Sequence, residues 1–330
     1  MPPRPSVLQI HPTRHCNLSC LHCYSLSGPG AQEEIDIATL AAAVTDAASA
    51  GYQVMGVSGG EPLLYSELRA LLAHATERGM RTTVTTNGML LDRKGLATLD
   101  GVTSILAISL DGVPASHNRM RNSAAAFGKM QSHLEAVRLS GIPFGFIFTL
   151  TQFNLNELEW VTDFALKAGA GLLQVHPLEI TGRAEARLPD ARPDHVEALV
   201  TYGEILRKKL EVGDRMAIQF DFAPTRMLRE SPECVLAGRA EAPASISEAV
   251  PSIVIEPDGE VVPLEFGFSR AFSFGNLREG PLHALLSRWR IEREADFRRL
   301  CRDVHAECTN PEAPAIVNWY EAIHARGLAS

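Results

Sequence analysis

Short apolar runs alternate with segments of helical period over about the first 180 residues. The runs predict strands, and the segments with apolar residues at every third or fourth position predict helices. The predicted strands cover residues 7–10, 54–57, 82–86, 105–110, 144–150 and 172–176, and the predicted helices cover 37–50, 66–78, 127–140 and 155–167. Strands that alternate with helices favour a parallel α/β sheet with right-handed crossovers. Ligands of such sheets bind at the carboxyl ends of the strands.

Six strand–helix units are too few for a complete barrel of eight units. A partial barrel and an open doubly wound sheet both fit the pattern. The pattern changes after Pro193, where we expect a hairpin around Pro257-Asp258-Gly259 between mainly helical segments. The later helices are expected over 194–210, 281–300 and 314–326, a strand over 216–222, a loop over 243–251 and the hairpin over 252–264. The sequence therefore predicts two domains, 1–190 and 191–330.

Composition sets the broad class of the protein. Apolar residues make up 45% of the 330 residues and charged residues 21%, which is typical of a globular chain with a sizeable core. The formal net charge is −8 and no long basic run is present, so no nucleic-acid partner is expected. No apolar stretch approaches the ~20 residues of a membrane helix, and the N-terminus lacks the apolar core of a signal peptide. We expect a cytoplasmic protein that does not bind membranes.

Three of the six cysteines follow the first predicted strand with the spacing Cys-x3-Cys-x2-Cys, at Cys16, Cys20 and Cys23. In a cytoplasmic chain such cysteines are more typical of a metal site than of disulfides. Three thiolates on one loop can converge on a [4Fe-4S] cluster and leave one iron open to a small chelating molecule. The alternatives are partly buried thiols and a zinc site with a histidine as fourth ligand. The neighbouring histidines are His11, His15 and His22.

Further motifs follow the next three predicted strands in order. GGEP stands at residues 59–62, TNG at 86–88 and ISLDG at 108–112. Together with the cysteine motif and the tyrosine after it, they resemble the radical SAM superfamily. Residues 117–121 resemble the HDxxRG-like segment of that family, with departures at Asn118 and Asn122. The resemblance covers residues 5 to about 180, and it implies a partial (β/α)6 TIM-type barrel with a small α+β C-terminal extension.

The resemblance implies a cofactor site at these strand ends. Cys16, Cys20 and Cys23 would hold a [4Fe-4S] cluster, and S-adenosyl-L-methionine would bind at its open iron. The residues expected to contact that cofactor are Tyr24, Gly59, Gly60, Glu61, Asn87, Ser109 and Arg121. Glu61 suits an α-ammonium group and Arg121 a carboxylate, because both contacts are charge-assisted hydrogen bonds.

The plainer interpretations of these residues are a tight turn with a solvated glutamate, a buried serine hydroxyl, a surface arginine and an asparagine that caps a turn. Asp111 is expected to be a turn residue before Gly112. His15 and His22 are expected to be loop residues beside the cluster. No general base is assigned, because the first step of the implied chemistry needs none.

Residues 234–308 resemble a reduced SPASM/twitch extension, which peptide-modifying members of the family carry. The matching pieces are Cys234 with Gly238, the hairpin over 255–263 and the segment 274–277. The family usually has a cysteine after the hairpin proline, where this chain has Leu264. Only Cys234, Cys301 and Cys308 remain, so a full pair of auxiliary clusters is excluded by count. Either they hold one auxiliary iron-sulfur cluster with a non-cysteine or open fourth position, or they are vestigial or buried thiols.

The resemblance implies an enzyme that cleaves S-adenosylmethionine to a 5′-deoxyadenosyl radical, which abstracts hydrogen from a substrate. The extension favours a ribosomally made peptide or a protein side chain as that substrate. A small metabolite such as a sugar, a nucleoside or a tetrapyrrole intermediate is the alternative, and a non-catalytic zinc-binding protein is the third.

The implied partners follow from this chemistry. A reductant such as flavodoxin or ferredoxin would supply the electron. About 15 residues precede Cys16, so we expect no leader-binding domain within the chain. Capture of a leader peptide would then need a separate leader-peptide-binding protein or an open sheet edge.

Overall fold

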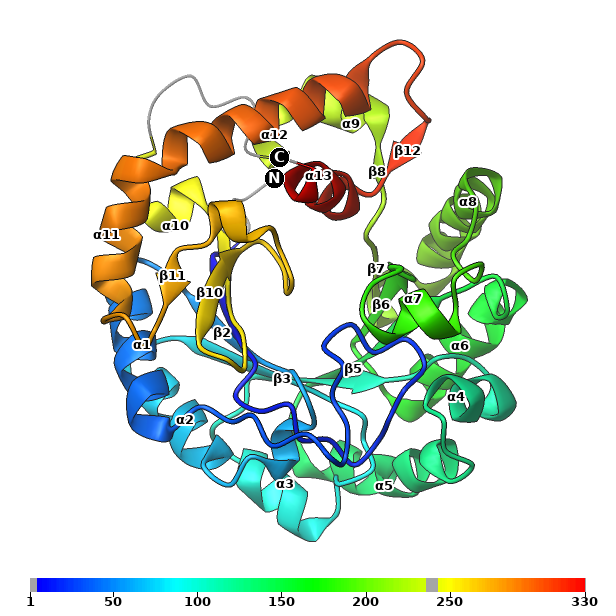
Figure 1. Ribbon diagram of the computed structural model, residues 1–330. Helices are drawn as coiled ribbons and strands as arrows, with labels where there is room; N and C mark the ends of the chain where they lie inside the picture. The colour runs from blue at the N-terminus through cyan, green and yellow to red at the C-terminus, as the bar shows by residue number, and fades with distance from the viewer. Residues whose placement is uncertain (1–4, 236–242, 330) are drawn as a thin grey trace.

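One curved sheet organises the computed structural model, which describes residues 5–235 and 243–329. Its ten strands follow the order β11-β10-β9-β1-β2-β3-β4-β5-β6-β7 (Figure 1). The strands are β1 (Val7–Ile10), β2 (Val54–Val57), β3 (Arg81–Thr86), β4 (Ile105–Ser109), β5 (Phe144–Leu150), β6 (Leu172–Pro177), β7 (Ala217–Phe220), β9 (Ser252–Ile255), β10 (Glu260–Pro263) and β11 (Gly275–Asn276). A small second sheet pairs β8 (Ala223–Pro224) with β12 (Ile316–Val317).

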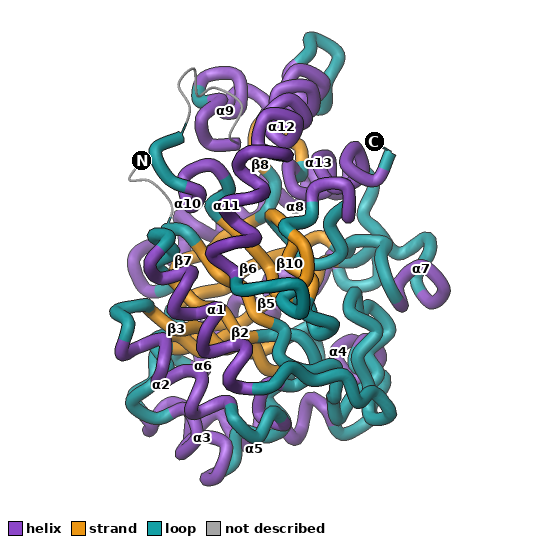
Figure 2. Tube along the Cα trace, turned by 60° about the vertical axis from the view of Figure 1, so that its left-hand side comes forward, coloured by secondary structure: helices purple, strands orange, loops and turns teal. Residues whose placement is uncertain are grey.

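Helices connect the strands, many of them along the outside of this sheet, as Figures 1 and 2 show. In the first part of the chain they are α1 (Ile37–Ser49), α2 (Leu68–Glu77), α3 (Arg93–Leu99), α4 (Pro114–Met120), α5 (Ala126–Ser140), α6 (Leu158–Ala168) and α7 (Arg183–Arg187). The later ones are α8 (His195–Val212), α9 (Thr225–Glu230), α10 (Ile246–Ala249), α11 (Leu282–Glu292), α12 (Glu294–Thr309) and α13 (Trp319–Leu328). Within residues 5–235 and 243–329, no helix is long and apolar enough to cross a bilayer.

The six strands predicted from apolar runs all form, and β1 to β6 pair in parallel with their sequence neighbours. Leu8, Met55 and Phe146 on these strands are fully buried. Asp36 caps α1 as expected, because its side chain accepts the Thr39 N–H at 2.9 Å. The arrangement confirms the partial barrel and brings the carboxyl ends of the strands to one side of the sheet.

The predicted hairpin also forms, and it joins the barrel. β9 pairs in parallel with β1, with Val7 opposite Ser252. At the other end of the sheet, β7 pairs in parallel with β6. Strands from both sides of residue 190 therefore share one sheet, and the domain boundary near that residue stays a prediction.

Two later expectations were wrong, and the helix expected over 314–326 begins only at Trp319, after the strand β12. The segment 281–300 is not one helix, because α11 ends at Glu292 and α12 begins at Glu294. Both helices turn their apolar residues toward one core, where Trp289 and Phe297 lie 5.6 Å apart between ring centroids, so the apolar pattern continues through the break. The expected loop over 243–251 contains the short helix α10, which Ser245 caps by accepting the Glu248 N–H.

Candidate active site

The cysteine loop, residues 11–35, leaves the carboxyl end of β1 and carries three thiols that pack together. Cys16 and Cys20 are each 8% exposed and lie beside the partly buried Cys23. Burial raises the pKa of the Cys16 thiol to about 12, with the Leu18 N–H opposing the rise and the nearby Glu61, Cys20 and Cys23 contributing to it. All six cysteines of the chain are free. The three thiols therefore need added positive charge to ionise together, as a bound metal cluster supplies.

Polar hydrogens already point at two of the sulfurs. The Leu18 N–H donates to Cys16 Sγ at 3.4 Å, and Arg121 Nη1 donates to Cys20 Sγ at 3.8 Å. Asn87 Nδ2 lies 4.0 Å from Cys16 Sγ. Hydrogen bonds of this kind stabilise thiolates and tune iron-sulfur clusters. The donor set therefore suits a [4Fe-4S] cluster held at three of its irons.

The zinc alternative finds less support. Among the described residues, no three His, Cys, Asp or Glu side chains, the three cysteines of the loop included, lie close enough to hold a single metal ion, whereas a cluster takes one thiolate at each of its irons. The His11 ring pairs with Ser58 Oγ at 2.9 Å, and His15 Nδ1 lies 3.3 Å from the Ala31 carbonyl. Desolvation of the partly buried His22 lowers its pKa to about 4. The arrangement does not supply the closed four-ligand set that structural zinc prefers.

Glu61 is a buried carboxylate at the end of β2 whose contacts are all neutral donors. It is 1% exposed, and burial raises its pKa. Its Oε1 accepts the Thr86 hydroxyl at 2.7 Å, and its Oε2 accepts the Asn87 N–H at 2.9 Å. Glu61 takes part in no ion pair among the described residues, although Arg121 is near enough to lower its pKa. A cationic group such as an α-ammonium would supply a counter-charge in direct contact.

The two glycines before Glu61 bring this turn against the cysteine loop. A Cβ on Gly60 would lie 2.1 Å from the His15 carbonyl oxygen, and one on Gly59 would lie 3.0 Å from the Thr13 carbonyl oxygen. Gly59 also has a φ of 107°. Only glycine fits this backbone contact, and the Gly60 N–H uses it to donate to the Thr13 carbonyl at 2.8 Å. The glycines thus position Glu61 beside the cysteines.

Arg121 and Asp111 form a buried ion pair next to Cys20. Arg121 Nε lies 2.6 Å from Asp111 Oδ2, and Asp111 is fully buried. Burial opposes ionisation of Asp111, but Arg121, with His22 and His117, outweighs it and holds the pKa of that carboxyl below its usual value. Asp111 therefore does more than form the turn that the sequence suggested. The sequence showed only that a glycine follows Asp111, and not that Arg121 lies beside it.

The remaining expected contacts lie around the same space. Ser109, at the end of β4, is 7% exposed. Asn87 donates to Asn17 Oδ1 on the cysteine loop at 2.8 Å and caps its own turn through the Met89 N–H at 3.0 Å, which confirms the expected turn cap, while its contact with the cofactor stays a prediction. Tyr24 is 41% exposed, and its ring centroid lies 5.3 Å from that of Phe266 in the loop after β10.

The three later cysteines are spread out. Cys301 is fully buried on α12, and Cys308 lies on the same helix at 9% exposure. Seven residues of helix separate them by about 10 Å along the axis. Cys234 is exposed in a short 3-10 helix, Pro232–Val235, and its partner in the expected motif, Gly238, lies outside the described residues. The auxiliary cluster stays a prediction.

Six ionisable residues that the sequence did not mark as a group lie near one another in the structure. We call them the ionisable wall; they are His176, Glu179, Asp221, Glu265, Glu321 and His324. Its members come from the ends of β6 and β7, the loop after β10 and helix α13. His324 Nδ1 lies 2.6 Å from Glu265 Oε1, and His176 pairs with Asp221. Burial, together with Glu265, raises the pKa of Glu179 to about 7. No local pattern marks these residues, because they meet only in the fold.

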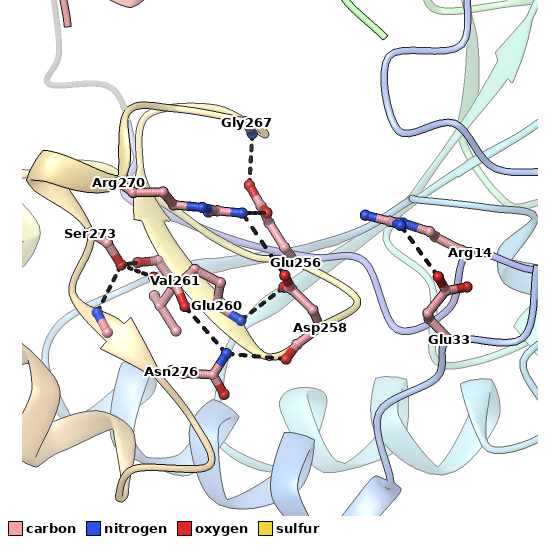
Figure 3. Close-up of polar contacts among 11 residues, drawn as sticks. Arg14, Glu33, Glu256, Asp258, Glu260, Val261, Gly267, Arg270, Ser273 and Asn276 are labelled. Carbon is pink, nitrogen blue, oxygen red and sulfur yellow. Dashed lines mark hydrogen bonds and ion pairs between the residues drawn. The ribbon is translucent and has the colours of Figure 1, made fainter. Parts of the chain in front are cut away.

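The hairpin that carries Glu265 and Phe266 is braced by its own polar contacts (Figure 3). The buried Glu256 accepts the Gly267 N–H at 2.7 Å and pairs with Arg270. Asn276 Nδ2 donates to the Asp258 carbonyl at 3.1 Å across the turn. These contacts fix the loop over 264–267, so its glutamate and phenylalanine are held in place beside the cysteine loop.

Proteins of known family are similar to this chain in sequence. Residues 10–165 match the model of the family described as the Radical SAM superfamily. Over 284 residues, the chain is 28% identical to a protein of Methanosarcina barkeri named Fe-coproporphyrin III synthase, covering 82% of this chain and 70% of that protein. Over 264 residues, it is 26% identical to a PqqA peptide cyclase of Ruegeria pomeroyi, covering 79% and 68%.

Solved structures share the fold. Streptococcus suis SuiB bound to S-adenosylmethionine superposes with a TM-score of 0.69 at 15% identity, over 93% of this chain and 68% of that one. The structure described as native anSMEcpe with bound AdoMet and Cp18Cys peptide gives a TM-score of 0.66 at 19% identity, over 99% and 96%. The similarity extends beyond the barrel into the C-terminal part of the chain.

Proposed function

This chain belongs to the radical SAM superfamily, and we propose that it is an enzyme that abstracts hydrogen from a ribosomally made peptide or a protein side chain. The observation that carries the proposal is the convergence of three free thiols with Glu61 and Arg121 at the carboxyl ends of β1 to β4. A [4Fe-4S] cluster and S-adenosylmethionine, when bound, supply a 5′-deoxyadenosyl radical there.

The residues of this chain have separate roles in the proposal. Cys16, Cys20 and Cys23 hold the cluster through three thiolates. Glu61 binds the α-ammonium of S-adenosylmethionine, because it is a buried carboxylate with no cation in direct contact among the described residues. Arg121 uses Nε and Nη1 within the protein, so a contact to the carboxylate falls to Nη2.

Tyr24, Gly59, Gly60, Asn87 and Ser109 complete the cofactor site. The glycines and Asn87 hold the strand ends against the cysteine loop, and Ser109 offers a hydroxyl at the end of β4. Tyr24 stands between this site and Phe266 of the later hairpin. The side chains exclude water from the radical and orient the substrate hydrogen, which is the protein's share of such chemistry.

Two observations support a peptide substrate. The chain is similar to proteins named PqqA peptide cyclase over most of its length. Two solved structures that share the fold also contain a peptide: one is described as SuiB bound to precursor peptide SuiA, and the other as anSMEcpe with bound AdoMet and Cp18Cys peptide.

A tetrapyrrole or another small metabolite is the second candidate substrate. The similarity to Fe-coproporphyrin III synthase favours it, because that relative covers 82% of this chain. Several relatives named PqqA peptide cyclase cover 79–86% of this chain, so we place the tetrapyrrole second. The zinc-binding alternative is third.

The C-terminal thiols and the partners complete the proposal. We propose that Cys301 and Cys308 pack as small hydrophobes and that the chain carries one cluster. Both thiols lie on α12 and belong to the hydrophobic core of the protein. The reduced thiols suit the cytoplasm, where flavodoxin or ferredoxin would supply the electron. A separate leader-peptide-binding protein is the further partner we propose.

One anaerobic experiment tests the function. The reconstituted protein is reduced with dithionite and supplied with S-adenosylmethionine, and 5′-deoxyadenosine is measured by chromatography. A candidate peptide from a neighbouring reading frame is then added, or coproporphyrin as the competing substrate, and the mass shift of each is measured. We expect 5′-deoxyadenosine in both cases and a mass shift in the peptide alone. A colourless protein that binds zinc and yields no 5′-deoxyadenosine would contradict the proposal.

A further inference from the structure

The loop after β6 contacts the cysteine loop at two consecutive residues, Gly182 and Arg183. Arg183 Nη1 donates to the Cys20 carbonyl at 2.7 Å, and its Nη2 donates to the Ser27 carbonyl at 2.8 Å. The Arg183 backbone N–H donates to the Cys23 carbonyl at 3.0 Å. One guanidinium therefore bridges two carbonyls that stand seven residues apart, on either side of Cys23.

Gly182 brings the two backbones into direct contact. Its φ is 59°, and a Cβ at this position would lie 2.4 Å from the Tyr24 carbonyl oxygen and 2.7 Å from that of Cys23. A side chain at 182 would push the loops apart, because the obstructing atoms belong to the backbone. The close approach at 182 is what allows Arg183 to reach the cysteine loop.

A small apolar cluster supports this contact from behind. Ala184 on α7 packs with Met120 and Leu178, and Leu21 of the cysteine loop lies against the same cluster. The Leu21 N–H donates to the Met120 carbonyl at 2.9 Å. In Figure 1, α7 lies beside the dark blue loop that carries the cysteines. The base of Arg183 is thus held by packing, so its guanidinium has a fixed direction.

We propose that Arg183 is a positioning residue that keeps the three thiols of the cysteine loop converged for cluster binding. The guanidinium prevents the Cys20 and Ser27 carbonyls from turning, and those carbonyls set the path of the chain through Cys23. A planar guanidinium can hold both oxygens at once, whereas a lysine ammonium at the same position concentrates its charge at one point. The inference rests on the proposed function for the identity of the bound group.

The test compares three variants with the wild type. Arg183→Met removes the bridge, Arg183→Lys keeps the charge without the planar fork, and Arg187→Met is the matched control on the exposed side of the same short helix. Each protein is reconstituted anaerobically, and the rate at which a ferrous chelator removes its iron is measured. Supporting contacts of metal ligands typically change affinity on the order of 10- to 100-fold. We expect Arg183→Met to lose iron faster by about that factor, Arg183→Lys to fall between, and Arg187→Met to match the wild type.

A second readout separates positioning from general damage to the fold. In the cluster-free proteins, the alkylation rates of Cys20 and Cys23 are compared by peptide mass spectrometry, alongside thermal unfolding. We expect faster alkylation in Arg183→Met with an unfolding midpoint close to that of Arg187→Met. If Arg183→Met does not fold, Arg183→Lys decides, and wild-type iron release from it would overturn the proposal.

The two proposals fail in different ways. A wild-type protein that takes up no iron and sulfide contradicts the proposed function, whatever the variants do. Wild-type iron release and alkylation rates in Arg183→Met, in a protein that does bind a cluster, contradict the positioning role alone.

Discussion

Arg121 Nε lies 2.6 Å from Asp111 Oδ2, and the same guanidinium donates to the Cys20 sulfur at 3.8 Å. The acid comes from the end of β4 and the base from the end of α4, so the pair ties a barrel strand and the following helix to the cysteine loop. Asp111 compensates the charge of Arg121 in a place where water is excluded. The pair thus keeps a cation beside a thiol without leaving that cation unpaired.

Asp111→Asn should destabilise the cluster-free protein. Removal of one partner of a buried ion pair typically costs about 3–5 kcal/mol of unfolding free energy, because the other charge stays buried without compensation. Urea unfolding of the wild type, Asp111→Asn, Arg121→Met and the double variant measures the effect. We expect the double variant to lose less stability than the sum of the single losses. Additive losses would show that the two side chains do not stabilise each other.

Glu61→Gln should weaken the binding of S-adenosylmethionine to the reconstituted protein. A hydrogen bond to a charged group contributes about 1.5–3 kcal/mol, which corresponds to about a 10- to 100-fold rise in Kd. Isothermal titration calorimetry under anaerobic conditions gives that constant. Glu67→Gln is the matched control, because Glu67 is exposed just before α2. Equal affinity of the Glu61→Gln variant and this control would remove Glu61 from the ammonium site.

Iron counting tests whether the chain holds one cluster. A Cys16→Ala/Cys20→Ala/Cys23→Ala variant should retain about zero iron per chain after anaerobic reconstitution, whereas the wild type should hold about four. Cys301→Ala/Cys308→Ala should keep the wild-type count, since we propose that these thiols only pack. Iron that persists in the triple variant and disappears from the double variant would instead establish the auxiliary cluster.

The local pattern of apolar residues predicted the strands and helices of the barrel, and the motifs predicted which side chains stand at the strand ends. Apolar runs located β1 to β6, and the motif order placed Glu61 and Asn87 beside the cysteine loop, because parallel strands bring their carboxyl ends together. Gly59 and Gly60 were expected to contact a ligand, which stays a prediction, and the structure shows that they allow a close backbone contact with the cysteine loop.

The long-range pairs could not be predicted in this way. Arg183 lies 163 residues from Cys20, and His324 lies 59 residues from Glu265. Such pairs depend on how α7 and α13 are placed against the barrel, and no spacing in the sequence records that placement. The break between α11 and α12 could not be predicted either, because both helices pack against one apolar core and the apolar pattern continues through the break.

Glu179 should make the stability of the protein depend on pH. Its pKa is raised from 4.5 to about 7 by burial and by Glu265, with Glu321 adding to the rise and His176 and His324 opposing it. Between pH 4.5 and about 7 the folded state therefore holds a proton that the unfolded state has released, so stability falls as pH rises through this window.

Glu179→Gln removes that loss and should be more stable than the wild type at pH 8, but not at pH 4.5. The full shift would correspond to about 3 kcal/mol, and partial exposure of the side chain reduces the expected gain to about 1–2 kcal/mol. Thermal and urea unfolding at the two pH values measure it, with the exposed Glu204→Gln on α8 as control. A gain of the same size at both pH values would mean that the substitution acts through packing, and that the Glu179 carboxyl titrates normally in the folded protein.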